Sequence, residues 1–308
     1  MLFDRLNNGS EELSALTGQW FASTPFALIS TEIDFALQEL ASIVGSGVTD
    51  AAEAAYEAGK DADFVRAVQL PVAIRAIARY AQLSGVSHEG TGRKVKMDDN
   101  EKMAFEWMID RDDRAMADRY YRALDALFRY LEKHSVEGWE TSPAKAEADG
   151  CIIGSLRDFE RFYPVDGSEY AFHRLIPLIL EAQTGTVEPF VGEEVWARIY
   201  PQVAEGDTVG EQILLRAKLL CVLLALVMAA QRWSLDVFPL SVARRFSPSY
   251  QGNRESSAAT IKEIDWFIAK TAKQIAAVKN ELKKLSSTAT EARLLPENDR
   301  RNKFATVI

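Results

Sequence analysis

A regular apolar repeat near the C-terminus constrains the fold of this chain more than any other feature. Apolar side chains recur there at alternating spacings of three and four residues, at Ile261, Ile264, Ile268, Ile275, Val278, Leu282 and Leu285. A period of 3.5 residues predicts a long amphipathic helix, assigned to residues 255–286, whose apolar seam packs against a partner helix. Two partners are open: a helix predicted at residues 103–133 of the same chain, or a helix of a second chain.

The same helix carries lysines that lie mostly off the seam and form a candidate basic contact face: Lys270, Lys273, Lys279, Lys283 and Lys284. Residues 254–308 contain eleven Lys or Arg and seven Asp or Glu, a net charge of +4, whereas the whole chain carries −9. Residues 1–253 therefore carry −13, which argues against a general DNA- or RNA-coating surface. A basic arm on an acidic body favours an acidic partner or a weak contact with nucleic acid, and the alternative is a solvated helix face.

The composition is that of a soluble globular protein, with 47% apolar and 26% charged residues. The most apolar run, residues 219–230, has twelve residues without a charge, whereas a membrane span needs about 20. We therefore expect a buried core helix and no membrane partner. The first twenty residues lack the features of a secretory signal, so a cytoplasmic protein is expected.

Strand signals are sparse and helical periodicity is extensive, which predicts a mainly α fold. We assign residues 1–30 to an N-terminal arm, 31–134 to a first helical lobe, 135–151 to a linker, 152–254 to a second helical lobe and 287–308 to a loose tail. In the first lobe, Pro71 is expected to kink or split the helix at 61–83. In the second lobe, Trp196 is expected to be buried.

The two lobes share one predicted order of elements, which favours an internal duplication. Each has a helix, a glycine break, a short helix, a long apolar helix, a short extended pair and a long amphipathic helix. The extended pair is a β-hairpin around residues 90–92 in the first lobe and an edge strand or extended turn at 235–246 in the second. Residue identity between the lobes is slight, so coincidence between two helical lobes is the alternative.

Motifs for catalysis, metal binding or cofactor binding are missing from the sequence. Its three histidines have no metal-ligand spacing, and Cys221 lies in the apolar run, where it is expected to be an inert core residue. The aspartates at 110, 112, 113 and 118 alternate with arginines, which favours ion pairing on a solvated helix face over a Mg²⁺ site. We expect no catalytic residue, no cofactor and no metal ion.

Several packing motifs resemble a family of structural proteins carried by phages and prophages of gut anaerobes. The resemblance covers residues from about 30 to 245 and lies in segments such as 73–81, 106–111 and 121–132 of the first lobe and 159–166, 175–182 and 187–196 of the second. The order of helices in each lobe also resembles the small connector proteins that form rings at the head–tail joint of tailed phages. This chain is about three times as long as those subunits and adds the heptad helix.

The resemblance implies a non-enzymatic virion structural or assembly protein of the neck, head–tail connector or completion type. Its partners would be other neck proteins, such as the portal or tail-side adaptors, and further copies of itself in a ring. It would be cytoplasmic during expression and then part of the virion. The alternatives are a bacterial helical adaptor or regulatory module unrelated to virions, and, third, a helical enzyme of unknown reaction.

Overall fold

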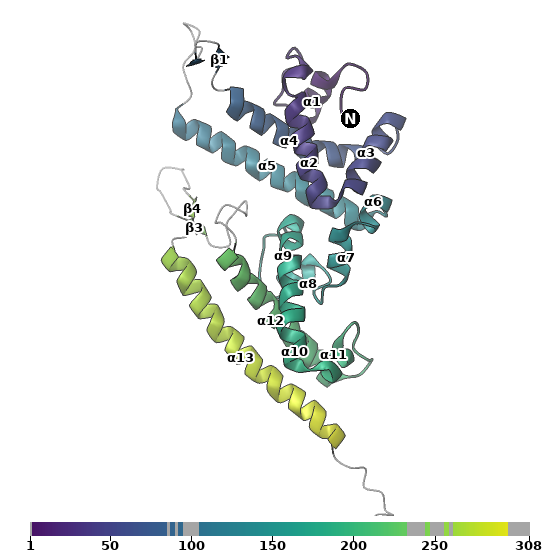
Figure 1. The fold of residues 1–308 in the computed structure, drawn as a ribbon, viewed down its shortest axis with the longest axis vertical. Helices are drawn as coiled ribbons and strands as arrows, with labels where there is room; N and C mark the ends of the chain where they lie inside the picture. Colours follow the sequence, from purple (N-terminus) through teal and green to yellow (C-terminus); the bar gives the residue numbers. More distant parts are fainter. Residues whose placement is uncertain are drawn as a thin grey trace, which may run out of the picture. The chain divides into compact units, whose positions relative to one another are not determined.

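The computed structural model describes residues 2–84, 87–89, 92–94, 105–232, 244–246, 256–258 and 261–294 (Figure 1). The chain is mainly helical, which confirms the predicted fold class. It divides into two compact units: unit 1 contains residues 1–149 and 165–174, and unit 2 contains residues 150–164 and 175–308.

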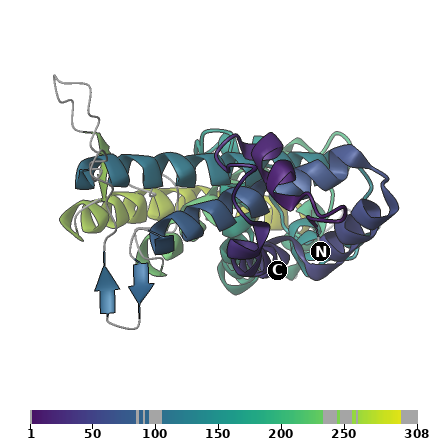
Figure 2. The same cartoon turned by 90° about the horizontal axis from the view of Figure 1, so that it is seen from above.

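Unit 1 is built around two long helices that follow one another in the chain. Its elements are α1 (Gly9–Thr17), η1 (Phe26–Leu28), α2 (Ser30–Val44), α3 (Ser46–Ala58), α4 (Ala62–Ser84), β1 (Ser87–Glu89), β2 (Gly92–Lys94), α5 (Glu106–Lys133), α6 (Glu137–Glu140) and α7 (Pro143–Asp149). Helix α4 packs against α2 and α5. Its apolar residues are buried on several sides, and the helix continues through Pro71 without splitting. Strands β1 and β2 pair antiparallel, with His88 opposite Arg93 (Figure 2).

The N-terminal segment, expected as an arm, is part of the core of unit 1. Leu2, Phe3 and Leu13 are buried in the same apolar cluster as α4 and α5. The Trp20 indole is also buried, and it donates a hydrogen bond to the Ser10 hydroxyl at 3.2 Å. Burial of these large side chains attaches residues 2–20 to the helices that follow.

The range predicted to be a linker is also folded, because it forms α6 and α7. Trp139 in α6 is fully buried and meets the Phe128 ring edge to face, with 5.8 Å between the ring centroids. Helix α6 packs directly on α3, where Gly138 lies against the backbone of Gly47. The abundance of small and polar residues at 135–151 therefore reflects a close helix contact rather than a flexible connection.

Residues 165–174, which come later in the chain, return to unit 1 and form its last part. The Asp125 carboxylate of α5 accepts hydrogen bonds from the Ser168 hydroxyl and the Tyr170 backbone N–H, both at 2.9 Å. The His173 ring stacks on Phe128 with 4.2 Å between the centroids. These contacts explain why one boundary between the units falls inside helix α9 (Glu169–Ala182).

Burial of His173 predicts that unit 1 loses stability in mild acid. Desolvation, with a smaller effect of the Lys145 ammonium, lowers the pKa of His173 from 6.5 to about 4. Its side chain is only 8% exposed, and Glu132 lies 3.9 Å from Nε2. Because the unfolded chain takes up the proton first, this contribution to stability is present above about pH 6.5 and is lost as the pH falls towards 4.

We expect the free energy of unfolding to drop by about 2 kcal/mol more in the wild type than in His173→Phe between about pH 7 and about pH 5. Urea titrations of both proteins at the two pH values measure this difference. An equal drop in both proteins would contradict the assignment to His173.

Unit 2 is organised around one apolar helix. Its elements are α8 (Leu156–Glu160), most of α9, η2 (Gln183–Val187), α10 (Glu188–Val191), α11 (Glu193–Ile199), α12 (Thr208–Arg232), β3 (Arg244–Phe246), β4 (Ser256–Ala258) and α13 (Ile261–Leu294). No residue from Ala217 to Ala230 is exposed. By length and composition α12 could also cross a membrane; half of its most apolar stretch is buried.

Three further sequence predictions concern Trp196, the range 235–246 and the end of the C-terminal helix. The predicted burial of Trp196 is confirmed, and its ring stacks on Tyr200 with 5.4 Å between the centroids. Of the range 235–246, only β3 lies within the described residues, and it pairs antiparallel with β4. Helix α13 begins after β4 and ends at Leu294, so residues 287–294 are helical rather than part of a loose tail.

Candidate interaction surface

Helix α13 packs along α12 inside unit 2, and the two helices run antiparallel (Figure 1). Among the described side chains of α13, Thr271, Val278 and Leu282 are buried, and Leu282 is completely inaccessible. Ile264, Ile268, Ile275 and Leu285 are half-buried, and Ile261 lies at the helix start, where no side chain is described. The seam residues therefore share one face, and the centre of that face is covered by the same chain.

Polar contacts at the edges of the seam fix the pairing of α13 with unit 2. The Arg216 guanidinium of α12 lies 2.7 Å from the Glu281 carboxylate of α13. Lys279 lies over the Phe190 ring of α10, with Nζ 5.5 Å from the ring centroid. The partner that the structure provides is thus α12 of the same chain. It is neither of the two partners that the sequence left open, which were the helix at residues 103–133, in unit 1, and a helix of a second chain.

The predicted basic face divides into two groups on the described part of α13. Lys279 is half-buried against Phe190, and Lys283 is exposed at the side of the helix. Lys270, Lys273 and Lys284 are exposed on the side opposite the seam. Lys262 and Trp266 lie on that same side, at helical spacings from Lys270. We call Lys262, Trp266, Lys270, Lys273 and Lys284 the basic stripe.

Trp266 is the member of this surface that the seam and charge patterns did not indicate. Its side chain is 62% exposed, although tryptophan is a large apolar residue. The Lys270 ammonium lies 4.7 Å from the centroid of its ring, a cation–π distance. In the sequence, Trp266 stands four residues after Lys262 and four before Lys270, outside the 3.5-residue apolar repeat. This spacing was the signal that places it on the lysine side of the helix.

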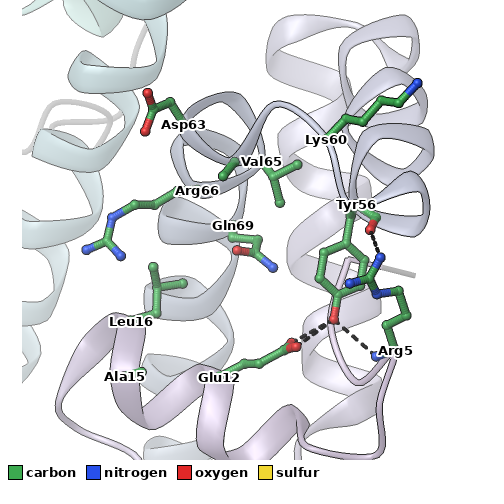
Figure 3. Close-up of a pocket in the computed structure, with 12 residues that line it drawn as sticks. Arg5, Glu12, Ala15, Leu16, Tyr56, Lys60, Asp63, Val65, Arg66 and Gln69 are labelled. Carbon is green, nitrogen blue, oxygen red and sulfur yellow. Dashed lines mark hydrogen bonds between the residues drawn. The ribbon is translucent and has the colours of Figure 1, made fainter.

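Unit 1 contains a separate open pocket of about 480 Å³ between α1, the end of α3 and the start of α4 (Figure 3). Its polar wall is a hydrogen-bonded group in which the Tyr56 hydroxyl donates to the Glu12 carboxylate at 2.7 Å. The Arg5 backbone N–H donates to the same hydroxyl at 3.1 Å, and the Arg5 guanidinium donates to the Tyr56 carbonyl at 2.9 Å.

The chemistry of this pocket favours a structural role. Desolvation, supported by the neighbouring Glu12 carboxylate, raises the pKa of Tyr56 to about 12, so the phenol stays protonated near neutral pH. Arg5 also donates to the Glu57 carbonyl at 3.0 Å, and Gln69 donates to the Leu2 carbonyl at 2.6 Å. These polar groups hold the N-terminal segment to α3 and α4.

The two cysteines, Cys151 and Cys221, are buried and form no disulfide. Desolvation raises the pKa of Cys151 to about 11 and also raises that of Cys221. Both thiols are therefore protonated near neutral pH and poorly nucleophilic. Within the described residues, no group of three or more His, Cys, Asp or Glu side chains is arranged to hold a metal ion.

Comparison of the chain with family models, with curated proteins and with solved structures gave no match. The clearest surface feature of the described residues is the basic stripe on α13, which carries an exposed tryptophan.

Proposed function

We propose that this chain is a structural or assembly protein of a phage or prophage virion, of the neck or head–tail connector type, and that it acts without catalysis. The observation that carries the proposal is a long helix whose inner face is satisfied within the chain while its outer face presents lysines around an exposed tryptophan. Such a surface is suited to binding a protein surface of opposite charge.

A similar order of elements in the two units supports the proposal that each unit descends from one small connector subunit of the ring-forming type. In unit 1, α2, α3, α4, the β1–β2 pair and α5 follow one another; in unit 2, the order is α10, α11, α12, the β3–β4 pair and α13. The glycines between the first two helices have nearly the same backbone angles, φ 94° and ψ 144° at Gly45, and φ 86° and ψ 153° at Gly192. Such positive φ values favour glycine.

The N-terminal parts of α5 and α13 share a short sequence similarity, which lies in the first turn of α5 and in the second turn of α13. Residues 105–109 read Phe-Glu-Trp-Met-Ile and residues 264–268 read Ile-Asp-Trp-Phe-Ile. Both tryptophans are exposed, Trp107 at 52% and Trp266 at 62%. An exposed tryptophan near the start of the last long helix of each unit supports a duplicated unit in which this residue serves binding rather than packing.

Deletion of the gene from the strain that carries it tests the proposed function. After prophage induction, we expect heads and unattached tails in place of complete particles, and electron microscopy of the lysate measures their ratio. A plasmid copy of the wild-type gene should restore tailed particles, and the chain should be detected in them by mass spectrometry. Complete infectious particles without the gene would contradict the proposal and favour a helical adaptor unrelated to virions.

A further inference from the structure

We propose that the basic stripe of α13 binds a second copy of this chain, on an acidic surface of unit 1 formed by α3, α6 and α7. The inference rests on the proposed role as an assembly subunit, and it names the two surfaces through which copies join. The contact is head to tail, because one copy contributes α13 and the other contributes unit 1.

The N-terminal part of the basic stripe is exposed to solvent. Lys262, Lys270 and Lys273 are exposed, and they lie on the helix face opposite the buried Thr271 and Leu282. The acidic residues nearest this face are at its borders, and one of them, Glu281, is already paired with Arg216. Trp266 offers a large apolar surface in the middle of these positive charges, a composition typical of the energetic centre of a protein interface.

The acidic surface lies on three short elements that pack in succession. Asp50 and Glu57 lie on the outer face of α3, opposite the buried Val48 and Ala52, with Glu53 between them in the sequence. Helix α6 packs on α3 and adds the exposed Glu137 and Glu140.

Helix α7 packs on α6 and extends the same acidic surface. It adds Glu147 and Asp149, both exposed. The one lysine in these elements, Lys145, forms ion pairs. Its Nζ lies 2.9 Å from a carboxylate oxygen of Asp149 and 3.7 Å from one of Glu132. The elements of this surface therefore present mainly negative charge.

Charge complementarity selects a second copy as the occupant. The chain carries both a basic stripe and an acidic surface, and residues 1–253 have a net charge of −13 against +4 for the remainder. A nucleic acid would meet the repulsion of this acidic body, whereas a second copy supplies the complementary surface. Because the two surfaces are different, the contact is heterologous, and its repetition produces a ring or a filament.

Charge reversal on each surface tests the contact. The first variant of the full chain combines Lys270→Glu with Lys273→Glu, and the second combines Asp50→Lys with Glu137→Lys. Sedimentation velocity in low salt, where screening is weak, should show concentration-dependent association of the wild type and loss of association in each variant alone. An equimolar mixture of the two variants should associate again, because each reversed surface then faces one of opposite charge.

Two further variants define the controls. Lys283→Asp changes an exposed lysine at the side of α13 and should associate like the wild type, whereas Trp266→Ala should weaken association by about thirtyfold. A wild type that stays monomeric in low salt, or a mixture of the reversed variants that stays monomeric, would overturn the inference. Neither result would decide the outcome of the virion assay, because incorporation into particles through another neck protein would still be seen.

Discussion

Replacing Gly138 with alanine should lower the free energy of unfolding of unit 1 by about 3 kcal/mol or more. A Cβ atom at this position would lie 2.2 Å from both the carbonyl carbon and the carbonyl oxygen of Gly47, and 2.7 Å from the Val48 nitrogen. All three atoms belong to the backbone of α3, so no side-chain rotation relieves the clash. Helix α6 must move away from α3, and the buried Trp139 must move with it.

Urea unfolding of Gly138→Ala and of a matched variant, Gly154→Ala, measures this effect. A Cβ at Gly154 meets no atom within 4 Å, so the control should unfold close to the wild type. Both changes add one methyl group to a glycine, and only the first adds it at a close backbone contact. Equal stability of the two variants would show that α3 and α6 do not approach as closely as described.

Replacing Leu282 with aspartate should detach α13 from unit 2 and cost about 4 kcal/mol or more, since it places a charge at a fully buried position with no partner. The apolar faces of α12 and α13 would then be exposed to water. We expect a lower midpoint of thermal unfolding by circular dichroism, together with increased binding of a hydrophobic dye.

Lys283→Asp is the matched control for this variant, because it introduces the same side chain one residue further along an exposed part of the helix. The control should unfold at the wild-type temperature. Measurements at concentrations where the wild type is monomeric separate packing within the chain from packing between chains. Normal stability of Leu282→Asp under those conditions would contradict intrachain packing and leave an intermolecular coiled coil.

Periodicity predicted the long amphipathic helices well, because apolar residues that recur every three to four positions share one side of the chain only in a helix. The helix expected at 103–133 is α5, beginning at Glu106, and the core helix expected from the apolar run at 219–230 is α12, which extends from Thr208 to Arg232. The predicted helix ends were less accurate where the end of the helix does not coincide with the end of an apolar repeat. Helix α13 illustrates this, since it continues to Leu294, beyond Leu285, the last residue of the predicted seam.

The candidate surface was only partly predictable for a similar reason. The seam and the lysines of α13 follow from residue type and spacing, but the sequence leaves open which helix covers the seam. The sequence places Trp266 among lysines and outside the seam, but it does not determine that the side chain is exposed, because burial of a tryptophan depends on what packs beside it.

The sequence by itself determined the helical class of this protein, the apolar character of α12 and the amphipathic character of α13, since these properties depend on residues close together in the chain. Only the tertiary structure decided that residues 2–20 and Trp139 belong to the core, and that Asp125 and Phe128 hold residues 168–173 to unit 1. Such choices depend on contacts between residues far apart in the chain. A local pattern can require that a side chain be buried, but it does not specify the surface that buries it.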